Sequence, residues 1–550
     1  MYLPLLQCIL AGLALAAPRQ RVFSSGEYPT LQGPNEHRIA IIGGGPSGAS
    51  AAYFFGTANK KLQDLAQHPD FLSHAPHELR TTVFERSRIG GRADAVYPLD
   101  DPGLERVEIG AGLIYETDKT LVRAIETFKL PWVSDQTRLA NLVGVWDGSQ
   151  FVVENDGSTW SQTKLLWRYG RSPTIALKLL GDAASAFSQL YNAAFLHRRP
   201  PHDGGVRPPA PLSGYPWDSV AELASAVLPK SLLSHSAYEY YTNEGVSPLF
   251  VNEMATAATR ANYAHDASSV NAFAGLYAFE AGESRHVQNG NHLLFEKMVN
   301  QSGADVRIGI RGTVTGIMKM QGNKWWVGTA DGHGGTFDSV LVATPWVSSG
   351  LALLNTRKFV HLSKYKEVHV TLVATCAPRP RAAFFNQSRK DSSMPRTILT
   401  APGAAASNAS QVPFISLSYI RDITPQQHQT EWGTLYVVRI LSYSALDDEL
   451  LSELFGNGTV AWVNRRVWGT LSDITHEAPL RSFEVDTGLY HTSVIESLLP
   501  TMEAAVISAK NVVALILTNW LGDVFVNGIN CRWPEHSGSK DWSGWGCNCS

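Results

Sequence analysis

The first clear pattern of apolar and polar positions lies near the beginning of the chain. Arg38–Ile42 is a short apolar run of the kind that forms a buried parallel strand. A glycine-rich turn follows, and Pro46–Phe55 is then rich in alanine and aromatic residues, with no breaker after Gly48. Thr81–Glu85 has the pattern of a second strand. The order of strand, turn, helix and strand predicts a mononucleotide-binding unit.

Another group of strands is predicted in the second half of the chain. Val306–Ile310, Thr313–Ile317, Lys324–Thr329 and Ser339–Ala343 are separated by glycine-containing turns. This run fits a small antiparallel layer that ends in a parallel strand. A helix predicted over about Thr501–Leu515 would then return the chain to the first unit.

The stretch Asn59–Arg80 separates the first two strands and is polar. It carries three histidines, His68, His74 and His77, among two prolines. Histidines can ligate a metal, but their irregular spacing and the prolines favour a surface insertion. From about Pro131 the pattern changes to aromatic and helical segments, which we interpret as a second, substrate-facing domain.

Composition limits the classes of protein to which the chain can belong. Its 550 residues exceed one compact core, so two intertwined domains are expected. Hydrophobic residues make up 44% and charged residues 17%, which is typical of a folded protein. The formal net charge is only −3 and no long basic run occurs, so nucleic acid is not an expected partner.

The N-terminal segment Met1–Ala17 is apolar and offers small residues at Ala14 and Ala16 for cleavage, so we interpret residues 1–17 as a signal peptide. A buried strand or helix is the alternative. We expect no later apolar stretch long enough to span a bilayer, which takes about 18 to 20 residues. The expected location is the secretory pathway, either secreted or inside a vacuole- or lysosome-like compartment.

Two residue types agree with that route. Five Asn-X-Ser/Thr sequons mark candidate glycosylation sites, at Asn300, Asn386, Asn408, Asn457 and Asn548. Four cysteines remain after the first segment, which is an even number that fits an oxidising compartment and allows three pairings; they are Cys376, Cys531, Cys547 and Cys549. Their spacing does not match paired metal-ligand sets, and no metal is expected.

The glycine-rich turn matches the Gly-X-Gly-X-X-Gly fingerprint of dinucleotide binding. Gly43 would allow the tight turn, Gly45 the approach of a pyrophosphate to the backbone, and Gly48 close packing of helix on strand. Glu85, at the end of the second strand, is the candidate acid for the ribose hydroxyls. It lies farther along the chain than the usual distance of about 20 residues, and the histidine-containing insertion accounts for that difference.

The residues after Glu85 separate FAD from NAD. Gly90-Gly91-Arg92 resembles the second signature of the flavin amine oxidase superfamily, in which the arginine faces the cofactor phosphates. Glu108–Gly112 resembles the segment of those enzymes that runs beside the flavin ring, and Val342–Pro345 resembles their returning strand.

The middle of the chain resembles the prenylcysteine oxidase (prenylcysteine lyase) family. The resemblance extends from about Arg38 to Leu515. The matching segments are Asn243–Ser247, Phe250, Asn252–Met254, Arg260–Tyr263, Val270–Gly275, Gly290-Asn291, Gly488–Glu496 and Met502–Ala505. The chain departs from the family at the insertion around His68, at the residue before Glu496, where the family usually has a glycine, and in a tail rich in cysteine and tryptophan.

This resemblance implies an α/β fold with a Rossmann-like FAD-binding domain of the two-layer flavin oxidase type and an interleaved α+β substrate domain. The predicted FAD-binding parts are residues 36–130, 301–346 and 481–518; the substrate parts are 131–300 and 347–480; and the tail is 519–550. The predicted cofactor-binding residues are Gly43, Gly45, Gly48, Glu85, Gly91, Arg92, Gly112, Val314, Glu496 and Met502.

The implied activity is oxidation of the carbon beside the thioether sulfur of a prenylated cysteine. Hydride would pass to FAD, water would capture the cation, and the adduct would give a prenyl aldehyde and cysteine, while oxygen would yield hydrogen peroxide. The expected partners are a small apolar substrate and molecular oxygen. One alternative is a secreted FAD oxidase of another apolar small molecule in a biosynthetic pathway; another is a flavin-binding interaction protein without turnover.

The sequence does not identify a catalytic acid or base. Three histidines and one acid lie near the middle motifs, namely His265, His286, His292 and Glu283, but lone histidines are more often structural. Four aromatic residues fit either an apolar substrate trough or ordinary core packing, namely Tyr263, Phe273, Tyr277 and Phe279.

Overall fold

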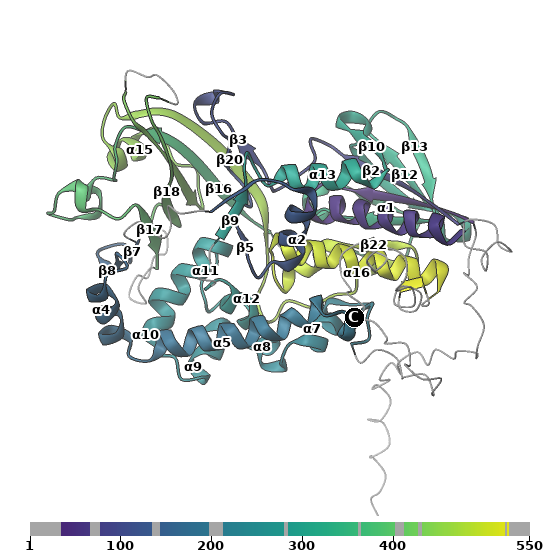
Figure 1. Cartoon of the computed structure of the whole chain (residues 1–550), viewed down its shortest axis with the longest axis horizontal. Helices are drawn as coiled ribbons and strands as arrows, with labels where there is room; N and C mark the ends of the chain where they lie inside the picture. The colour runs from purple at the N-terminus through teal and green to yellow at the C-terminus, as the bar shows by residue number, and fades with distance from the viewer. Residues whose placement is uncertain are drawn as a thin grey trace, which may run out of the picture.

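The computed structural model shows a mixed α/β protein (Figure 1). It describes residues 35–66, 77–134, 143–196, 213–279, 284–360, 365–401, 412–426, 432–522 and 525–526. The predicted signal segment, most of the predicted tail, Asn408, Asn548 and three of the four remaining cysteines lie outside these residues.

A six-stranded sheet forms the centre of the first region. Its order is β10 (Asp305–Ile308), β2 (Glu78–Glu85), β1 (Glu36–Ile42), β14 (Ser339–Val342), β22 (Leu489–His491) and β21 (Glu484–Asp486). All neighbours pair in parallel except β21 and β22. The predicted strand–turn–helix–strand unit is therefore present, with β1 in the interior of the sheet.

The two faces of this sheet are covered by different layers. Ile39 and Ile41 of β1 belong to a core shared with α1 (Pro46–Ala66), α13 (His292–Ser302) and α16 (Met502–Leu521). The alternate residues Ala40 and Ile42 join a second core with the small sheet. This alternation follows from the two-residue period of a strand, and it explains why the four consecutive residues Ile39–Ile42 are all apolar and buried.

The small sheet has the order β13 (Gly334–Phe337), β12 (Trp325–Thr329), β11 (Val314–Lys319) and β15 (Ala352–Leu354). The predicted antiparallel run is confirmed for β11 to β13. The prediction for Val306–Ile310 was wrong in its partner, because β10 instead pairs in parallel with β2 at the edge of the six-stranded sheet. A glycine-containing turn after β10 is compatible both with the predicted antiparallel pairing and with the observed parallel pairing to β2, so the sequence did not distinguish them.

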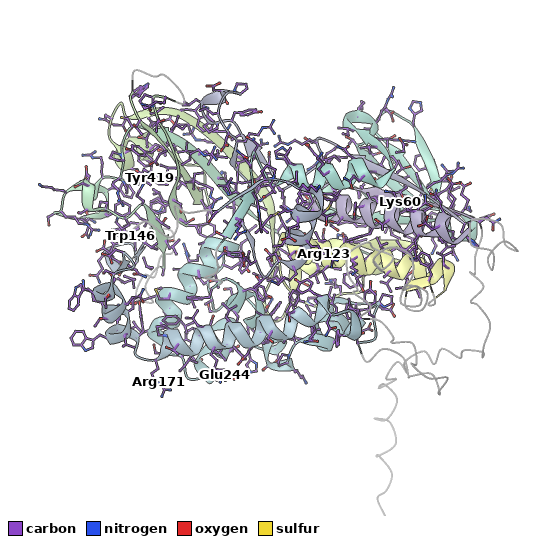
Figure 2. The ribbon with its side chains drawn as sticks, viewed as in Figure 1. Lys60, Arg123, Trp146, Arg171, Glu244 and Tyr419 are labelled. Atoms are coloured by element: carbon purple, nitrogen blue, oxygen red, sulfur yellow. The ribbon has the colours of Figure 1, made fainter. Side chains whose placement is uncertain are left out.

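The second region contains a seven-stranded sheet and a layer of helices below it (Figure 1). The strand order is β20 (Val460–Ser472), β16 (Tyr365–Thr375), β19 (Leu435–Ser442), β18 (Ser416–Ile423), β17 (Thr397–Thr400), β7 (Val143–Trp146) and β8 (Phe151–Asn155). Trp146 and Tyr419 are buried within this region (Figure 2). The sheet combines strands from two distant stretches of chain, so the two regions are interleaved.

The helical layer is formed mainly by residues 159–277. Its helices are α4 (Thr159–Tyr169), α5 (Ser172–Phe187), α7 (Val220–Val227), α8 (Lys230–Ser234), α9 (Ala237–Asn243), α10 (Pro248–Phe250), α11 (Thr256–Tyr263) and α12 (Ala272–Tyr277). The predicted domain boundaries stay predictions. Helix α13, most of which falls in the predicted substrate part 131–300, packs on α1 of the first region.

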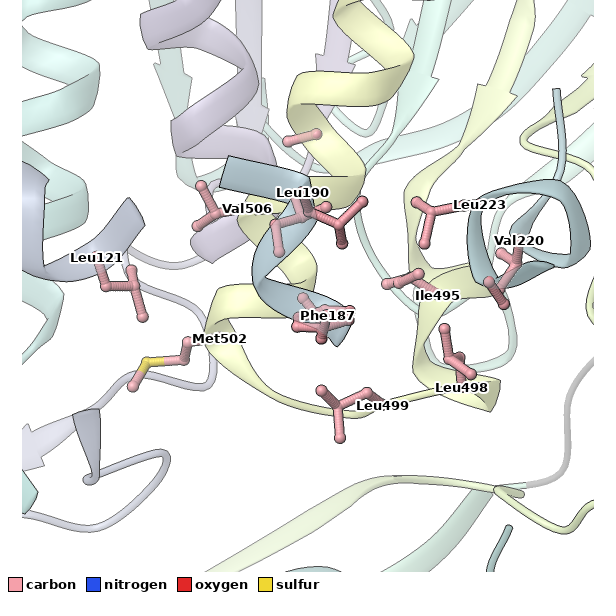
Figure 3. Close-up of a cluster of buried hydrophobic side chains, with 14 of the residues drawn as sticks. Leu121, Phe187, Leu190, Val220, Leu223, Ile495, Leu498, Leu499, Met502 and Val506 are labelled. Atoms are coloured by element: carbon pink, nitrogen blue, oxygen red, sulfur yellow. The ribbon is translucent and has the colours of Figure 1, made fainter. Parts of the chain in front are cut away.

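Apolar side chains from the helical layer and the C-terminal segment meet in one core (Figure 3). Phe187, at the end of α5, lies near Leu499, while Met502 lies beside Leu121 of α2 (Lys119–Phe128). All four side chains are buried. The start of α16 is therefore fixed by apolar contacts from several parts of the chain.

Two expectations about chain segments need correction. The segment Asn59–Arg80 is not wholly a surface insertion, because α1 continues to Ala66 and His77 is buried with its ring 5.6 Å from that of Trp520. We also expected that no later apolar stretch would be long enough to span a membrane. By length and composition alone α16 is such a stretch, because it has 20 residues and is sufficiently apolar to cross a bilayer. Most of α16 is buried within the protein, as expected for a core helix.

Candidate functional site

The glycine-rich turn connects β1 to α1 through two positions that require glycine. Gly43 has a φ of +105°, and its N–H donates to the Phe84 carbonyl at 2.8 Å. A Cβ atom on Gly48 would lie 1.8 Å from the carbonyl oxygen of Gly43. The tight turn and the close approach of helix to strand therefore exist as the sequence indicated.

A second glycine turn lies directly against the first. The Gly90 N–H donates to the Gly44 carbonyl at 2.9 Å, and a Cβ on Gly91 would lie 2.9 Å from Gly45 Cα. On Gly45, by contrast, an added Cβ would find no atom closer than Gly91 Cα at 3.8 Å. This space beside bare backbone, at the start of a long helix, fits a pyrophosphate.

Glu85 links the end of β2 to both of these turns. Its carboxylate accepts the Gly44 N–H at 2.7 Å and the Ser87 N–H at 2.8 Å, and the residue is 8% exposed. Each carboxylate oxygen keeps a further lone pair, so the group can still accept hydrogen bonds from ribose hydroxyls. The position predicted from sequence is thus at the carboxyl edge of the sheet, where open α/β sheets bind nucleotides.

Arg92 and Glu496 form an ion pair across the site. The guanidinium Nη2 and Nη1 lie 2.5 and 3.2 Å from the two carboxylate oxygens. Burial disfavours the charged guanidinium, but the Glu496 carboxylate outweighs this effect and raises the pKa of Arg92. Two predicted cofactor residues are therefore in direct contact, and the Arg92 side chain keeps 35% of its surface exposed.

The C-terminal motif also contacts the first glycine turn. Ser47 donates from Oγ to Thr492 Oγ1 at 2.7 Å, and the Thr492 carbonyl accepts from Ser508 of α16 at 2.8 Å. The His491 ring approaches the Thr344 carbonyl at 3.1 Å, and burial lowers the pKa of His491 to about 4. The departure from the family pattern before Glu496 therefore leaves this segment packed on the site.

Gly112 lies in the segment that follows β4 (Val107–Glu108). The Ala111 N–H donates to the Arg92 carbonyl at 2.9 Å, so this segment is held beside the ion pair. A Cβ on Gly112 would lie 3.0 Å from Glu108 Cβ and 3.3 Å from Nη1 of Arg439. Gly112 thus directly follows a residue that is hydrogen-bonded to Arg92, and its role in cofactor binding stays a prediction.

Glu108 is a buried carboxyl that sequence reasoning did not single out. Its Oε1 accepts the Asn291 N–H at 2.6 Å, while Asn291 Nδ2 donates to the Ala111 carbonyl at 3.1 Å. Burial raises the pKa of Glu108 to about 8, against the smaller opposing effects of that hydrogen bond and of Arg439. These contacts tie the segment up to Gly112 to the start of α13.

Two predicted residues have buried side chains. Val314 is 6% exposed and packs between the two sheets, and Met502 is 7% exposed in the core shown in Figure 3. Sequence reasoning missed the neighbouring Gly312, whose added Cβ would lie 2.3 Å from the Glu85 carbonyl oxygen. Gly312 thus holds the chain just before Val314 against the end of β2, and the role of Val314 in cofactor binding stays a prediction.

Sequence reasoning also missed two polar residues near the predicted site. Tyr365, at the start of β16, hydrogen-bonds to Glu496, and burial raises the pKa of Tyr365. Glu503 accepts the backbone N–H groups of Thr120 and Leu121 at 2.9 and 3.0 Å and so closes the first turn of α2. No motif precedes Tyr365, whereas the position of Glu503 in the first turn of α16 was a usable signal.

The candidate catalytic residues that the structure describes have different neighbours. His265 lies 3.2 Å from the ammonium of Lys366, and His292 lies 2.8 Å from Arg106, with its pKa lowered to about 4 by burial and by neighbouring arginines. His286 lies on β9 (Ser284–Val287), and Glu283 is outside the described residues. The catalytic residue therefore stays unassigned.

The candidate trough aromatics pack against other core residues. The Phe273 ring lies 5.2 Å from that of Phe187 and 4.8 Å from that of Tyr277, while Phe279 stacks on Phe250 at 5.5 Å. These contacts favour core packing over a trough. Within the part of the chain that the structure describes, no cluster of three metal-ligating side chains occurs.

Comparison with known proteins places this geometry in context. A family model described as prenylcysteine lyase matches residues 152–526, more than half of the chain. Prenylcysteine oxidase 1 of Mus musculus is 26% identical and covers 95% of this chain and 94% of its own. Farnesylcysteine lyase of Arabidopsis thaliana is 23% identical over 88% of both chains.

The fold has relatives among solved structures. A double mutant of putrescine oxidase superposes with a TM-score of 0.52 at 13% identity, and the match covers 88% of this chain and 99% of that one. The wild-type putrescine oxidase bound to putrescine gives a TM-score of 0.51. The expected fold class, that of the flavin oxidases, is thereby confirmed.

Proposed function

The chain belongs to the prenylcysteine lyase family, and we propose that it is an FAD-dependent oxidase that cleaves the thioether of an S-prenylated cysteine. The products are a prenyl aldehyde, cysteine and hydrogen peroxide. The observation that carries this proposal is the single site formed by the two glycine turns, Glu85 and the Arg92–Glu496 pair. This site matches a dinucleotide, and the family supplies the substrate class.

The proposed reaction balances with oxygen and water as co-reactants. The carbon beside sulfur loses a hydride, water adds its oxygen to that carbon, and the carbon–sulfur bond then breaks to release aldehyde and thiol. FAD, when bound, supplies the two-electron chemistry that connects the substrate to oxygen. The protein contributes orientation of the reacting carbon and exclusion of bulk water.

Individual residues of the site suit the parts of FAD. The open backbone at Gly45 and Gly91 suits the pyrophosphate, and Glu85 suits the adenosine ribose. The part-exposed Arg92 supplies positive charge beside these turns, and Glu496 holds its guanidinium in place. The proposed cofactor is therefore bound by segments from both ends of the chain.

We also propose that the protein enters the secretory pathway and is glycosylated. The three sequon asparagines that the structure describes, Asn300, Asn386 and Asn457, are all exposed, as attachment of a glycan requires. Cys376 is unpaired among the described residues, which include no other cysteine. The proposed final location is either outside the cell or inside a vacuole- or lysosome-like compartment.

The test uses the purified full-length protein and its visible spectrum. A flavin spectrum is expected, and farnesylcysteine added without oxygen should bleach it; admission of oxygen should restore the colour with release of thiol and peroxide. Putrescine is the matched control substrate, because the similar solved structures are amine oxidases, and it should leave the flavin oxidised.

Three outcomes would contradict the proposal at different points. A colourless protein that takes up no added FAD would overturn the cofactor. A yellow protein that ignores farnesylcysteine and oxidises another apolar compound would favour the biosynthetic alternative, and one without any turnover would favour the interaction protein. Bleaching without thiol release would show that a different bond is oxidised.

A further inference from the structure

Helix α4 carries apolar side chains on two faces. One face, formed by Ser161, Leu165 and Tyr169 at four-residue spacing, points toward the protein and is buried or half-buried. The Tyr169 ring lies 5.3 Å from that of Phe250 on α10. These contacts anchor the helix, so the remaining face of α4 is free to serve another purpose.

The opposite face of α4 presents two tryptophans to solvent. Trp160 is 66% exposed and Trp167 is 94% exposed, and their spacing of two turns puts them on one stripe. Lys164 lies between them, with its ammonium 5.5 Å from the centre of the Trp160 ring. Leu166, beside this stripe, is 59% exposed. Exposed clusters of large apolar side chains mark sites of association.

Further exposed apolar residues lie on the helices that adjoin α4. Leu177 of α5 is 53% exposed. The Ser247 N–H donates to Ser172 Oγ at 2.9 Å, which connects the chain before α10 to the start of α5. We call Trp160, Leu166 and Trp167, all on α4, the tryptophan patch. It lies at the end of the helical layer where α4 and α10 are seen in Figure 1.

The charged residues of α4, and of the chain from α4 to the middle of α5, are basic. Residues 157–181 contain Lys164, Arg168, Arg171 and Lys178, and the nearest carboxylates in sequence are Asp156 just before this range and Asp182 just after it. Arg168 is neutralised by Glu253, to which it donates at 2.8 and 2.5 Å. The other three are exposed, and Arg171 lies at the outer edge of the helical layer (Figure 2).

We propose that the tryptophan patch docks this protein on an anionic lipid bilayer. In that arrangement Trp160 and Trp167 lie at the level of the headgroups, and Lys164, Arg171 and Lys178 face lipid phosphates and carboxylates. Tryptophan and leucine flanked by lysine and arginine are typical of helices that lie in a membrane interface. Tryptophan and arginine are common in protein–protein interfaces as well, but lysine is depleted from them, so Lys164 and Lys178 favour the bilayer over a protein partner. This inference goes beyond the proposed oxidase activity and does not depend on it.

The experiment measures binding of the full-length protein to vesicles by co-sedimentation. Vesicles of phosphatidylcholine mixed with phosphatidylserine should bind the protein more tightly than phosphatidylcholine alone, and added salt should weaken that difference. The double substitution Trp160→Ser/Trp167→Ser should weaken binding at least about tenfold, because it removes the two interfacial anchors. Thermal unfolding of this variant should stay unchanged, since both side chains are exposed.

Two further variants test the contribution of the basic residues and control for the loss of an exposed tryptophan elsewhere on the protein. Lys164→Glu/Arg171→Glu should lower binding to the serine-containing vesicles and leave binding to phosphatidylcholine nearly unchanged. Trp432→Ser, at a tryptophan 37% exposed in the turn before β19, is the matched control and should bind like the original protein.

Each of the following results would overturn the proposal. The first is that the original protein does not sediment with either kind of vesicle. The second is that the double tryptophan variant binds as tightly as the original protein. The third is that the Trp432→Ser variant loses as much binding as the double tryptophan variant. A protein that dimerises without vesicles, and a double tryptophan variant that does not, would assign the patch to a protein interface instead.

Discussion

The guanidinium of Arg92 is held by the carboxylate of Glu496 through two hydrogen bonds, although 404 residues separate them in the chain. The pair is asymmetric, because the Arg92 side chain is 35% exposed and that of Glu496 only 5%. A charge left alone is costly in proportion to its burial. The two partners should therefore respond differently to substitution.

Arg92→Gln is expected to lower the free energy of unfolding by about 3 kcal/mol, because it removes the positive charge that balances the buried Glu496 carboxylate and leaves it only the hydrogen bond from Tyr365. Glu496→Gln should cost less, since Arg92 can reach water. The double variant should be more stable than the sum of the single effects indicates. Urea unfolding measures these values.

The matched control for this pair is Asp448→Asn. Asp448 pairs with Arg465 at 2.5 Å, but its side chain is 86% exposed, so the substitution should change stability by at most about 0.5 kcal/mol. Additive effects of the Arg92 and Glu496 substitutions would show that the two side chains do not act as a pair.

Two glycines of the same turn should separate folding from cofactor binding. Gly48→Ala is expected to destabilise the protein by more than about 3 kcal/mol, because its Cβ would overlap the Gly43 carbonyl oxygen at 1.8 Å. Gly45→Ala should fold normally, since its Cβ meets nothing within 3.8 Å. It should nevertheless hold FAD at least about tenfold more weakly.

The ratio of flavin to protein after gel filtration, together with the thermal midpoint of the flavin-free protein, measures both effects. A Gly45→Ala protein that retains flavin fully would contradict the proposal that the pyrophosphate lies against Gly45. A Gly48→Ala protein as stable as the original would contradict the close approach of α1 to the turn.

Stability should depend on pH through Glu108. An unfolded carboxyl titrates near 4.5, whereas burial raises the folded pKa of Glu108 to about 8. The folded state therefore keeps a proton that the unfolded state releases, and stability is lost as the pH rises from about 5 to 8. Glu108→Gln should remove this loss, because its amide does not titrate.

The difference in unfolding free energy between the original protein and Glu108→Gln, measured at several pH values, isolates this group. Buried histidines such as His292 and His491 have lowered pKa values near 4, so they act in the opposite direction and are common to both proteins. Parallel pH profiles would show that Glu108 is ionised in the folded state.

Glycosylation should occur at the exposed sequons. After expression through a eukaryotic secretory pathway, Asn386→Gln and Asn457→Gln should each reduce the intact mass by one glycan, and endoglycosidase should remove the difference. Both asparagines are exposed and lie in turns. A mass that endoglycosidase leaves unchanged would exclude glycans at these positions.

The local elements of the site were predictable from sequence because their chemistry is local. The turn from Gly43 to Gly48 follows from backbone sterics, and Glu85 follows from its place at the end of a strand, so both were found despite the unusual spacing. The second glycine turn and the C-terminal segment were found by resemblance. Their contact through Arg92 and Glu496 is a product of tertiary packing that neither segment reveals.

Other features had no local signal. Tyr365 reaches Glu496 only because β16 begins beside it, and residues around the start of a strand carry no mark of such a contact. The parallel pairing of β10 depends on a free edge at β2, which the sequence of β10 does not record. The exposure of Trp167 likewise appears only once the other face of α4 is seen to be anchored.

The position of β22 determines when this protein can become functional during its synthesis. The ribosome releases β1, β2 and β14 long before β22, which pairs with the remaining edge of β14. Until then that edge is open to pairing with other chains. A premature stop codon before Leu489 should therefore produce a chain that contains the whole glycine fingerprint and yet aggregates, because it lacks both β22 and the core helix α16.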